Sequence, residues 1–432
     1  MSSNPIDTAR AVRDAHDNPQ PDAIRDAGSP AELAAQQRMA NELQSIGATV
    51  TTHTFRVHPR ATVAWTYCWT VLLTLGWVLF FICPAATLIC IVLAALTAFL
   101  QKVLCLPIVD KLFDPRESVN VVATLAPQGE TRRRVVFNAH PDAAYQRHWH
   151  TIGGRMAYCL MSIALPMLGM LYLAMLATIA VCTRQAVSTP HGNLLYAGLA
   201  STLFVPIWAM FCYHADCDRT VRDTSDNLDA CRTAIRIAQA LSEDSARPEH
   251  TEITILLTGA KYAGLCGAKA FVREHPHFGA KHDLPTVFVT LDTMDSAYRM
   301  TLLYRDLNGW KRQSRAACAL VQQAAKDELG NAMPNCTSLC FVTDAAALSK
   351  KGRQAVAITA NPYLPRPLRF AQPPTQADLD SVVRLGVAIA RAADRQTNEH
   401  PAAADTPTAT EDVQLAAQTP TDAPAENAHT QN

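Results

Sequence analysis

The chain has 432 residues, enough for two or three domains or for one large α/β domain with additional segments. It carries 38 Lys and Arg against 38 Asp and Glu, and this zero net charge argues against a general nucleic-acid binder, which should have a basic excess. Hydrophobic residues reach 49% and charged residues only 18%, below the roughly 25% of a typical soluble domain.

The N-terminal segment, residues 1–28, is polar and rich in Asp and Arg, so we expect no signal peptide there. The run Ser29-Pro30-Ala31-Glu32 then predicts a capping box with Pro at the first helical position. This helix should end near Ile46-Gly47.

Three long stretches contain no Asp, Glu, Lys or Arg: residues 61–101, 156–183 and 185–215. About 20 apolar residues span a bilayer, so the first stretch is long enough for two spans, with Pro84 near its middle. We predict four membrane helices in two hairpins, at about 62–82, 85–105, 157–182 and 193–213. The alternative, buried core helices, is disfavoured because four such runs do not fit one soluble core.

Charges beside the predicted spans indicate an orientation. Because the helices come in pairs, everything outside them lies on one side of the membrane. That side carries eight basic residues near the spans, whereas the far side has only Arg184. These eight are Arg56, Arg60, Lys102, Lys111, Arg147, Arg155, Arg219 and Arg222. The positive-inside rule then places the soluble part in the cytoplasm, and the thirteen cysteines without zinc-type spacing fit a reducing compartment.

The remaining chain alternates between strand and helix patterns, which predicts an α/β fold: a mixed sheet with helices on both faces. Strands are expected at Val50–Val57, Val119–Leu125, Arg134–Asn138, Glu252–Leu257, Thr286–Leu291, Leu339–Val342 and Ala355–Thr359. Helices are expected at Asn227–Ser242, Gly267–His275, Ser314–Leu329 and Gln376–Asp394. The tail, residues 397–432, lacks aromatic residues and is expected to be disordered.

Polar residues stand at four element ends, where ligands bind in open α/β sheets. They are His140 and Asp142 after one strand, Asp226 at the start of a helix, the turn from Gly259 to Gly267, and Asp292 after another strand. One His and two Asp would suit a zinc site, with Asp142 orienting the His140 ring. Each also has a plain structural role, such as an N-cap for Asp226 or a turn residue for Asp292.

The order of these motifs resembles the co-catalytic di-zinc aminopeptidases, the twenty-eighth metallopeptidase family. The matching segments are Ser225-Asp226-Asn227-Leu228-Asp229-Ala230, the Gly259–Gly267 turn and Val342-Thr343-Asp344-Ala345-Ala346. The resemblance covers about 29–57, 117–145 and 222–396, and implies two membrane hairpin insertions, 58–116 and 146–221. It implies zinc ligands at His140 and Asp292, a bridging carboxylate at Asp226 and an orienting carboxylate at Asp142.

Three positions depart from the family pattern. Lys261 and Tyr262 replace a Glu-Glu pair that supplies the general base and a metal ligand, and the final His is missing, with Phe370 or Ala371 in its place. A protonated lysine cannot take a proton from water, and the lost ligands should weaken both zinc sites. We hypothesise that the Lys261 ammonium sits among Asp226, Asp292 and Asp142 and replaces the metal charge; alternatively, Lys261 points into water.

Three functions compete. The first is a membrane-embedded peptidase fold that has lost catalysis and binds a peptide or partner protein. The second is an active metal-dependent aminopeptidase with an altered, single-metal site formed by His140, Asp226 and Asp292. The third, a transporter or channel, is disfavoured because the charge-free stretches that form the spans contain none of the charged residues that substrate pathways need.

Overall fold

A mixed sheet of nine strands organises the α/β part of the chain. The structure is a computed structural model that describes residues 25–143, 160–215, 225–338, 341–360 and 374–399. The strand order is β1-β2-β4-β3-β5-β9-β6-β7, and β8 pairs with β6. The strands are β1 (Thr49–Val57), β2 (Arg116–Leu125), β3 (Arg133–Ala139), β4 (Thr251–Leu257), β5 (Thr286–Leu291), β6 (Met300–Asp306), β7 (Lys311–Arg312), β8 (Asn335–Thr337) and β9 (Gln354–Ala360).

Helices cover both faces of this sheet because the central strands are apolar on both sides. In β3, Val135 and Phe137 face one core and Val136 faces the other. The first core is covered by α2 (Pro30–Ser45), α9 (Ser225–Ser242), α11 (Arg315–Leu329) and α14 (Gln376–Glu399), and the second by α10 (Cys266–Glu274) and α12 (Asp344–Lys350). The predicted mixed sheet with helices on both faces is therefore confirmed.

Strand register brings the expected site residues to one edge. β3, β4, β5 and β9 are parallel, with Ala139 opposite Leu257 and Asn138 opposite Thr290. The residues that follow these strands, among them His140 and Asp292, therefore emerge at the same carboxyl edge.

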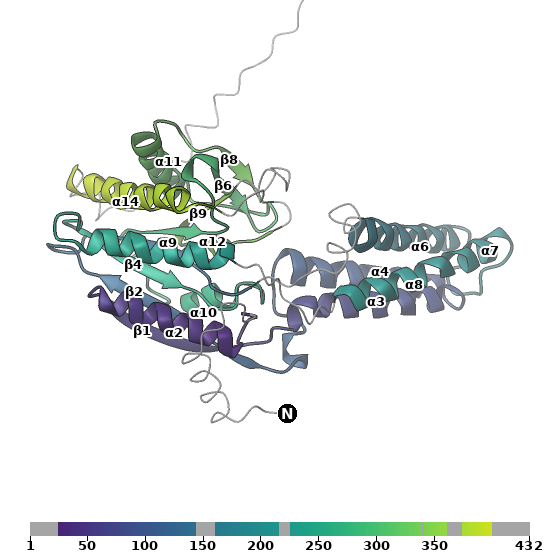
Figure 1. Ribbon diagram of the computed structural model, residues 1–432. Coiled ribbons are helices and arrows are strands. Elements are labelled where there is room, and N and C mark those ends of the chain that lie inside the picture. The colour runs from purple at the N-terminus through teal and green to yellow at the C-terminus, as the bar shows by residue number, and fades with distance from the viewer. Residues whose placement is uncertain (1–24, 144–159, 216–224, 339–340, 361–373, 400–432) are drawn as a thin grey trace, which may run out of the picture.

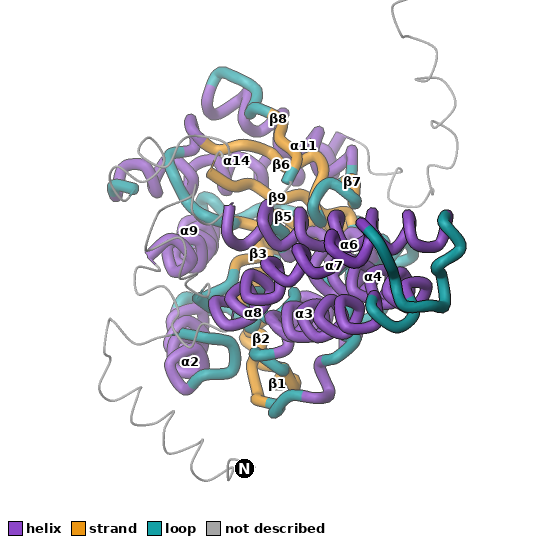
Figure 2. The backbone as a smooth tube through the Cα atoms, turned by 90° about the vertical axis from the view of Figure 1, so that its right-hand side faces the viewer, coloured by secondary structure: helices purple, strands orange, loops and turns teal. Residues whose placement is uncertain are grey.

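A helical bundle projects from one end of the α/β part (Figure 1). It consists of α3 (Ala61–Phe80), α4 (Pro84–Ala98) with the adjoining turn η1 (Phe99–Val103), η3 (Leu160–Ala164) with α6 (Leu165–Cys182), and α7 (Asn193–Ala200), η4 (Ser201–Leu203) and α8 (Phe204–Ala215). Viewed after a quarter turn, these helices lie in front of the sheet (Figure 2). Trp69, Leu73, Leu173 and Trp208 are among the residues of their buried core.

Within the described residues, three helices are long and apolar enough to cross a membrane: Pro84–Val103, Leu165–Cys182 and Asn193–Cys212. The first predicted span corresponds to a shorter apolar stretch, Trp65–Phe80. Large apolar side chains on these helices point outward, including Val71, Ile89, Leu171 and Leu203. The outer surface of the bundle is therefore apolar as well as its core.

Lysines of the α/β part hold the base of the bundle. Lys350 Nζ donates to the carbonyl of Leu104 at 3.0 Å, and Lys269 Nζ donates to the carbonyl of Cys105. Phe99 packs edge-on against Trp310, with ring centroids 5.2 Å apart. The last carbonyls of a helix lack intrahelical donors, so cations at this end are favourable. The bundle is thereby attached to α10 and α12.

The structure changes some sequence expectations. The strand expected at Leu339–Val342 is wrong at Phe341 and Val342, which are not in a strand; Leu339 and Cys340 lie outside the described residues. Strands β6, β7 and β8 were not expected. α14 continues to Glu399, beyond the expected boundary at 396. Residues 400–432 and 1–24 lie outside the described part of the chain.

Close packing in the bundle depends on glycine. A Cβ on Gly198 would lie 2.4 Å from Phe80 Cε1, closer than real contacts allow. We expect Gly198→Leu to lower the thermal midpoint in detergent, at a cost of about 1–3 kcal/mol of overpacking. Ala200→Leu, on the exposed face of the same helix segment, should leave the midpoint unchanged. Equal midpoints for the two variants would refute this packing.

Candidate functional site

Four expected site residues lie together at the carboxyl edge of the sheet. His140 follows β3, Lys261 lies in the turn after β4, and Asp292 follows β5. Relative exposures are 1% for His140, 0% for Asp142, 5% for Lys261 and 3% for Asp292. These charged groups are therefore buried, where each needs a partner because desolvation penalises a lone charge.

Asp142 orients the His140 ring and also holds the turn after β4. His140 Nδ1 lies 2.8 Å from Asp142 Oδ1, and Tyr262 N donates to Asp142 Oδ2 at 2.8 Å. A carboxylate oxygen accepts hydrogen bonds, so a proton on Nδ1 satisfies this contact and leaves Nε2 facing away from Asp142. Nε2 lies 3.9 Å from Asp292 Oδ1, too far for a hydrogen bond.

Lys261 and Asp292 form a buried ion pair. Lys261 Nζ donates to Asp292 Oδ2 at 2.7 Å, while Thr293 N donates to Oδ1 at 2.8 Å. The alternative that Lys261 points into water is therefore wrong. Burial alone would lower the pKa of Lys261, but the Asp292 carboxylate outweighs it and raises that pKa. Burial would likewise raise the pKa of Asp292, but the Lys261 ammonium lowers it, so both groups stay charged.

The pKa of His140 reflects burial and three charged neighbours. Burial and the Lys261 ammonium both act to lower this pKa, but the carboxylates of Asp142 and Asp292 outweigh them and leave it raised. The His140 ring therefore interacts electrostatically with the Lys261–Asp292 pair.

The side chains of other predicted positions lie outside the described residues. Asp226 lies in the first turn of α9, but its side chain lies outside the described residues. Phe370 and Ala371 also lie outside them. The part of the hypothesis that places Lys261 beside Asp226 therefore stays a prediction.

Asp344 joins the cluster although sequence reasoning gave it no role. It is fully buried at the start of α12, and Thr258 Oγ1 donates to its Oδ2 at 2.5 Å. Burial raises the pKa of Asp344, and this effect outweighs the charges of His140 and Lys261, which act to lower it. Within the described residues, Asp344 Oδ1 and His140 Nε2 are buried without a hydrogen-bond partner. The available signal was the segment Val342-Thr343-Asp344, which matched the family pattern.

A second unexpected residue, Asp306, fixes the start of α12. Its carboxylate accepts from the hydroxyl of Thr343 and from Gln313 Nε2 at 3.2 Å. Burial raises the pKa of Asp306 to about 6. Because Thr343 precedes Asp344, this network positions Asp344.

Glu32 holds the turn that carries Lys261. Ser29 Oγ accepts from Glu32 N at 3.1 Å, which confirms the capping interaction at the start of α2. Glu32 Oε1 accepts from Ala260 N at 2.8 Å, and Oε2 accepts from Gly28 N at 2.6 Å. Ala260 has a φ of 53°, a left-handed conformation that costs energy for a residue with a side chain. Glu32 supplies a contact that stabilises it.

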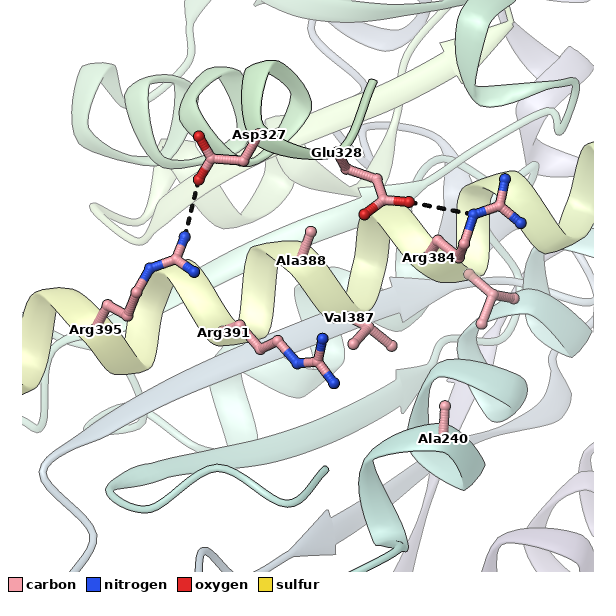
Figure 3. A pocket seen from close by; sticks show the side chains of 9 residues that line it. Ala240, Asp327, Glu328, Arg384, Val387, Ala388, Arg391 and Arg395 are labelled. Carbon is pink, nitrogen blue, oxygen red and sulfur yellow. Dashed lines mark hydrogen bonds and ion pairs between the residues drawn. The ribbon is translucent and has the colours of Figure 1, made fainter. Parts of the chain in front are cut away.

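A pocket of about 380 Å³ lies elsewhere, between α9, α11 and α14 (Figure 3). Ion pairs cross it, with Arg395 Nη2 2.8 Å from Asp327 Oδ2 and Arg384 Nε 3.2 Å from Glu328 Oε1. It contains none of the residues of the buried cluster, so the cluster remains the candidate site.

Several solved structures are similar to this chain. No family model and no curated protein matches it. A glutaminyl cyclase from Fimbriiglobus ruber is similar at a TM-score of 0.48 and 12% identity, over 91% of this chain and 97% of that one. An aminopeptidase from an Aneurinibacillus species gives a TM-score of 0.48 and 13% identity, over 90% and 94%. A zinc aminopeptidase from Bacillus subtilis gives 0.46 and 11%, over 88% and 93%. Identities and scores this low assign no activity to this chain.

The buried Glu32 predicts a pH dependence of stability. Burial, followed by the charge of Asp142, raises the pKa of Glu32 from 4.5 to about 8. The folded state therefore holds a proton that the unfolded state loses, so this contribution to stability is complete below about pH 4.5 and is lost as the pH rises to about 8. The loss is at most about 5 kcal/mol, since one pKa unit corresponds to about 1.4 kcal/mol.

We expect Glu32→Gln to remove this slope, although the variant loses hydrogen bonds at every pH. The measurement is the denaturation midpoint of both proteins between pH 4.5 and 8. Glu42→Gln, an exposed position on the same helix, is the control and should keep the parent slope. Parallel profiles for the parent and Glu32→Gln would show that Glu32 is not protonated in the folded chain.

Proposed function

We propose that this chain is a membrane-embedded relative of the zinc aminopeptidases that has lost hydrolysis and binds a peptide or protein partner. One observation carries the proposal: Lys261 Nζ lies 2.7 Å from Asp292 Oδ2 inside a buried site. Lys261 stands where the family resemblance has its water-activating carboxylate. A lysine held in its charged form by Asp292 cannot accept a proton from water.

The described residues do not fit a zinc pair. Asp292 Oδ2 is bonded to the ammonium, and Oδ1 accepts from Thr293 N. A divalent cation at His140 would share a low-dielectric site with that ammonium, and like charges repel strongly there. Lys261 instead supplies the positive charge that the carboxylates of Asp142, Asp292 and Asp344 require. No hydrolytic step follows from these residues.

A binding role is supported by the two unsatisfied atoms of the cluster. His140 Nε2 and Asp344 Oδ1 are buried without partners in the described part of the chain. A buried polar atom without a partner costs about 1–3 kcal/mol, and a ligand that supplies the missing hydrogen bonds recovers that cost. The terminus of a peptide carries polar groups of this kind.

The alternative is an active metal-dependent aminopeptidase with an altered site. Its supporting observation is that His140 Nε2 has no hydrogen-bond partner and lies 3.9 Å from Asp292 Oδ1, so both atoms could turn toward one ion. Zinc would then compete with Lys261 for Asp292. Metal content and amino-terminal cleavage separate the two functions.

We expect the purified chain to release no amino-terminal residues from peptides, and we expect His140→Ala to leave its zinc content unchanged. Lys261→Glu removes the ammonium and adds a carboxylate, so we expect this variant to bind zinc. The double variant Lys261→Glu with His140→Ala should lose that zinc again. The measurements are elemental analysis and an aminopeptidase assay. Zinc that depends on His140 in the parent, together with cleavage, would establish the alternative instead.

The ion pair itself can be tested by stability. Removing one partner of a buried pair costs about 3–5 kcal/mol, so we expect Lys261→Met to lower the thermal midpoint strongly. Adding Asp292→Asn should restore part of the loss, because no uncompensated charge remains. Lys281→Met, at an exposed lysine, is the control. A Lys261→Met variant as stable as the control would exclude a structural charge at this position.

The membrane placement is also part of the proposal. The bundle helices have apolar outer surfaces. At the far end of the bundle, the start of α4 meets the loop that follows α6, where Ala85 N donates to the carbonyl of Ala186 at 2.9 Å. We propose that the helices of the bundle form two membrane hairpins, and that both hairpins end at this far end of the bundle. The excess of basic residues in the sequence segments that flank the predicted spans supports a cytoplasmic α/β part.

An epitope tag inserted after Val187, an exposed residue between α6 and α7, tests this orientation. We expect protease added to intact cells to remove this tag and to spare a tag at the C-terminus until the cells are permeabilised. Removal of the C-terminal tag but not the Val187 tag from intact cells would reverse the orientation, and protection of both tags would exclude a chain that crosses the membrane in this way.

A further inference from the structure

A second cluster of metal-ligating side chains lies away from the buried ion pair. His53 lies on the edge strand β1, while Glu274 ends α10 and His275 follows it. His53 shares a strand face with Phe55 and Val57, because side chains alternate along a strand. Phe55 and Val57 pack against α10 and the turn before it, including Ala263 and Ala270. This packing brings the two histidines together across 222 residues of sequence.

The histidine nitrogens are spaced as two ligands of one ion. His275 Nε2 lies 3.2 Å from His53 Nε2. Two nitrogens bound to zinc at about 2.0–2.1 Å in a tetrahedron are roughly 3.3–3.4 Å apart. One ligand atom from each of His53, Glu274 and His275 can be chosen so that all lie within 4.8 Å of one another. Glu274 is exposed, so its side chain can rotate and bring a carboxylate oxygen closer to the two histidine nitrogens.

The His275 side of the cluster is held in place before any ion binds. His275 N donates to the carbonyl of Phe271 at 2.9 Å, and Arg353 Nη2 donates to the carbonyls of His275 at 3.3 Å and Pro276 at 2.6 Å. The His275 ring lies against Phe271, with centroids 5.0 Å apart. A ligand fixed in this way loses little conformational entropy on binding.

We propose that His53, Glu274 and His275 bind one divalent transition-metal ion of the zinc class, with a fourth position open to water. Two imidazoles and one carboxylate match the ligand set of open zinc sites. Burial, followed by the neighbouring His53, lowers the pKa of His275, which favours the neutral imidazole that a metal requires. The competing explanation is a simple hydrogen bond between the two rings, which needs no ion.

This site is separate from the His140 cluster. The Lys261 turn precedes the first residue of α10, whereas Glu274 is its last residue, and nine helical residues span about 13 Å. The inference therefore does not depend on the proposed loss of hydrolysis.

The test is zinc titration of the full chain in detergent, followed by equilibrium dialysis, elemental analysis and the thermal midpoint. We expect one zinc equivalent that is lost in His53→Ala and in His275→Ala. Glu274→Gln should weaken binding about 10–100-fold. His277→Ala, an exposed histidine two residues further on, should keep the equivalent.

His140→Ala separates this proposal from the proposed function. If zinc is bound here, His140→Ala retains the equivalent and its midpoint still rises on zinc addition. Circular dichroism is used to check that His53→Ala and His275→Ala are folded, and His53→Gln is a second, milder variant. An equivalent that persists in all three folded variants, or no zinc uptake by the parent, overturns the inference. A zinc equivalent that is lost only in His140→Ala would contradict this inference and also the proposal that the His140 cluster binds no metal.

Discussion

The buried ion pair between Lys261 and Asp292 is the interaction on which the candidate site depends. Three carboxylates, those of Asp142, Asp292 and Asp344, are buried at one edge of the sheet. Without a cation they would repel one another and take up protons. Lys261 supplies one positive charge from within the chain, and Asp292 in turn keeps that lysine charged. Lys261 thus offsets part of the negative charge of this site, and the proposed loss of hydrolysis rests on this contact.

The rest of the fold holds this pair from two directions. Glu32, near the start of α2, bonds to the backbone of Ala260 and so fixes the turn that presents Lys261. On the other side, Lys269 and Lys350 attach α10 and α12 to the base of the bundle. α10 follows the Lys261 turn, and α12 begins at Asp344. The two helices that flank the buried cluster are therefore both in contact with the base of the bundle.

The sequence predicted the parts of the fold that leave a periodic or compositional trace. The charge-free runs became the helices of the bundle, and the apolar runs of the central strands became β3, β4, β5 and β9. β6, β7 and β8 were missed because their pairing depends on distant partners; β6 pairs with β9, and its residues include Thr301, Tyr304 and Arg305 without clear alternation. The strand expected at Leu339–Val342 was wrong at Phe341 and Val342, which lead into α12.

The sequence by itself determined that His140, Lys261 and Asp292 follow apolar runs, and strand ends in a parallel sheet share one edge, so their proximity could be predicted. It also determined that an ammonium stands where a carboxylate was expected. Only the tertiary structure decided that Lys261 pairs with Asp292, that Asp344 and Glu32 belong to the same site, and that His53 meets His275. These contacts join residues far apart in the chain, and their distances depend on strand register and helix packing, which no local pattern encodes.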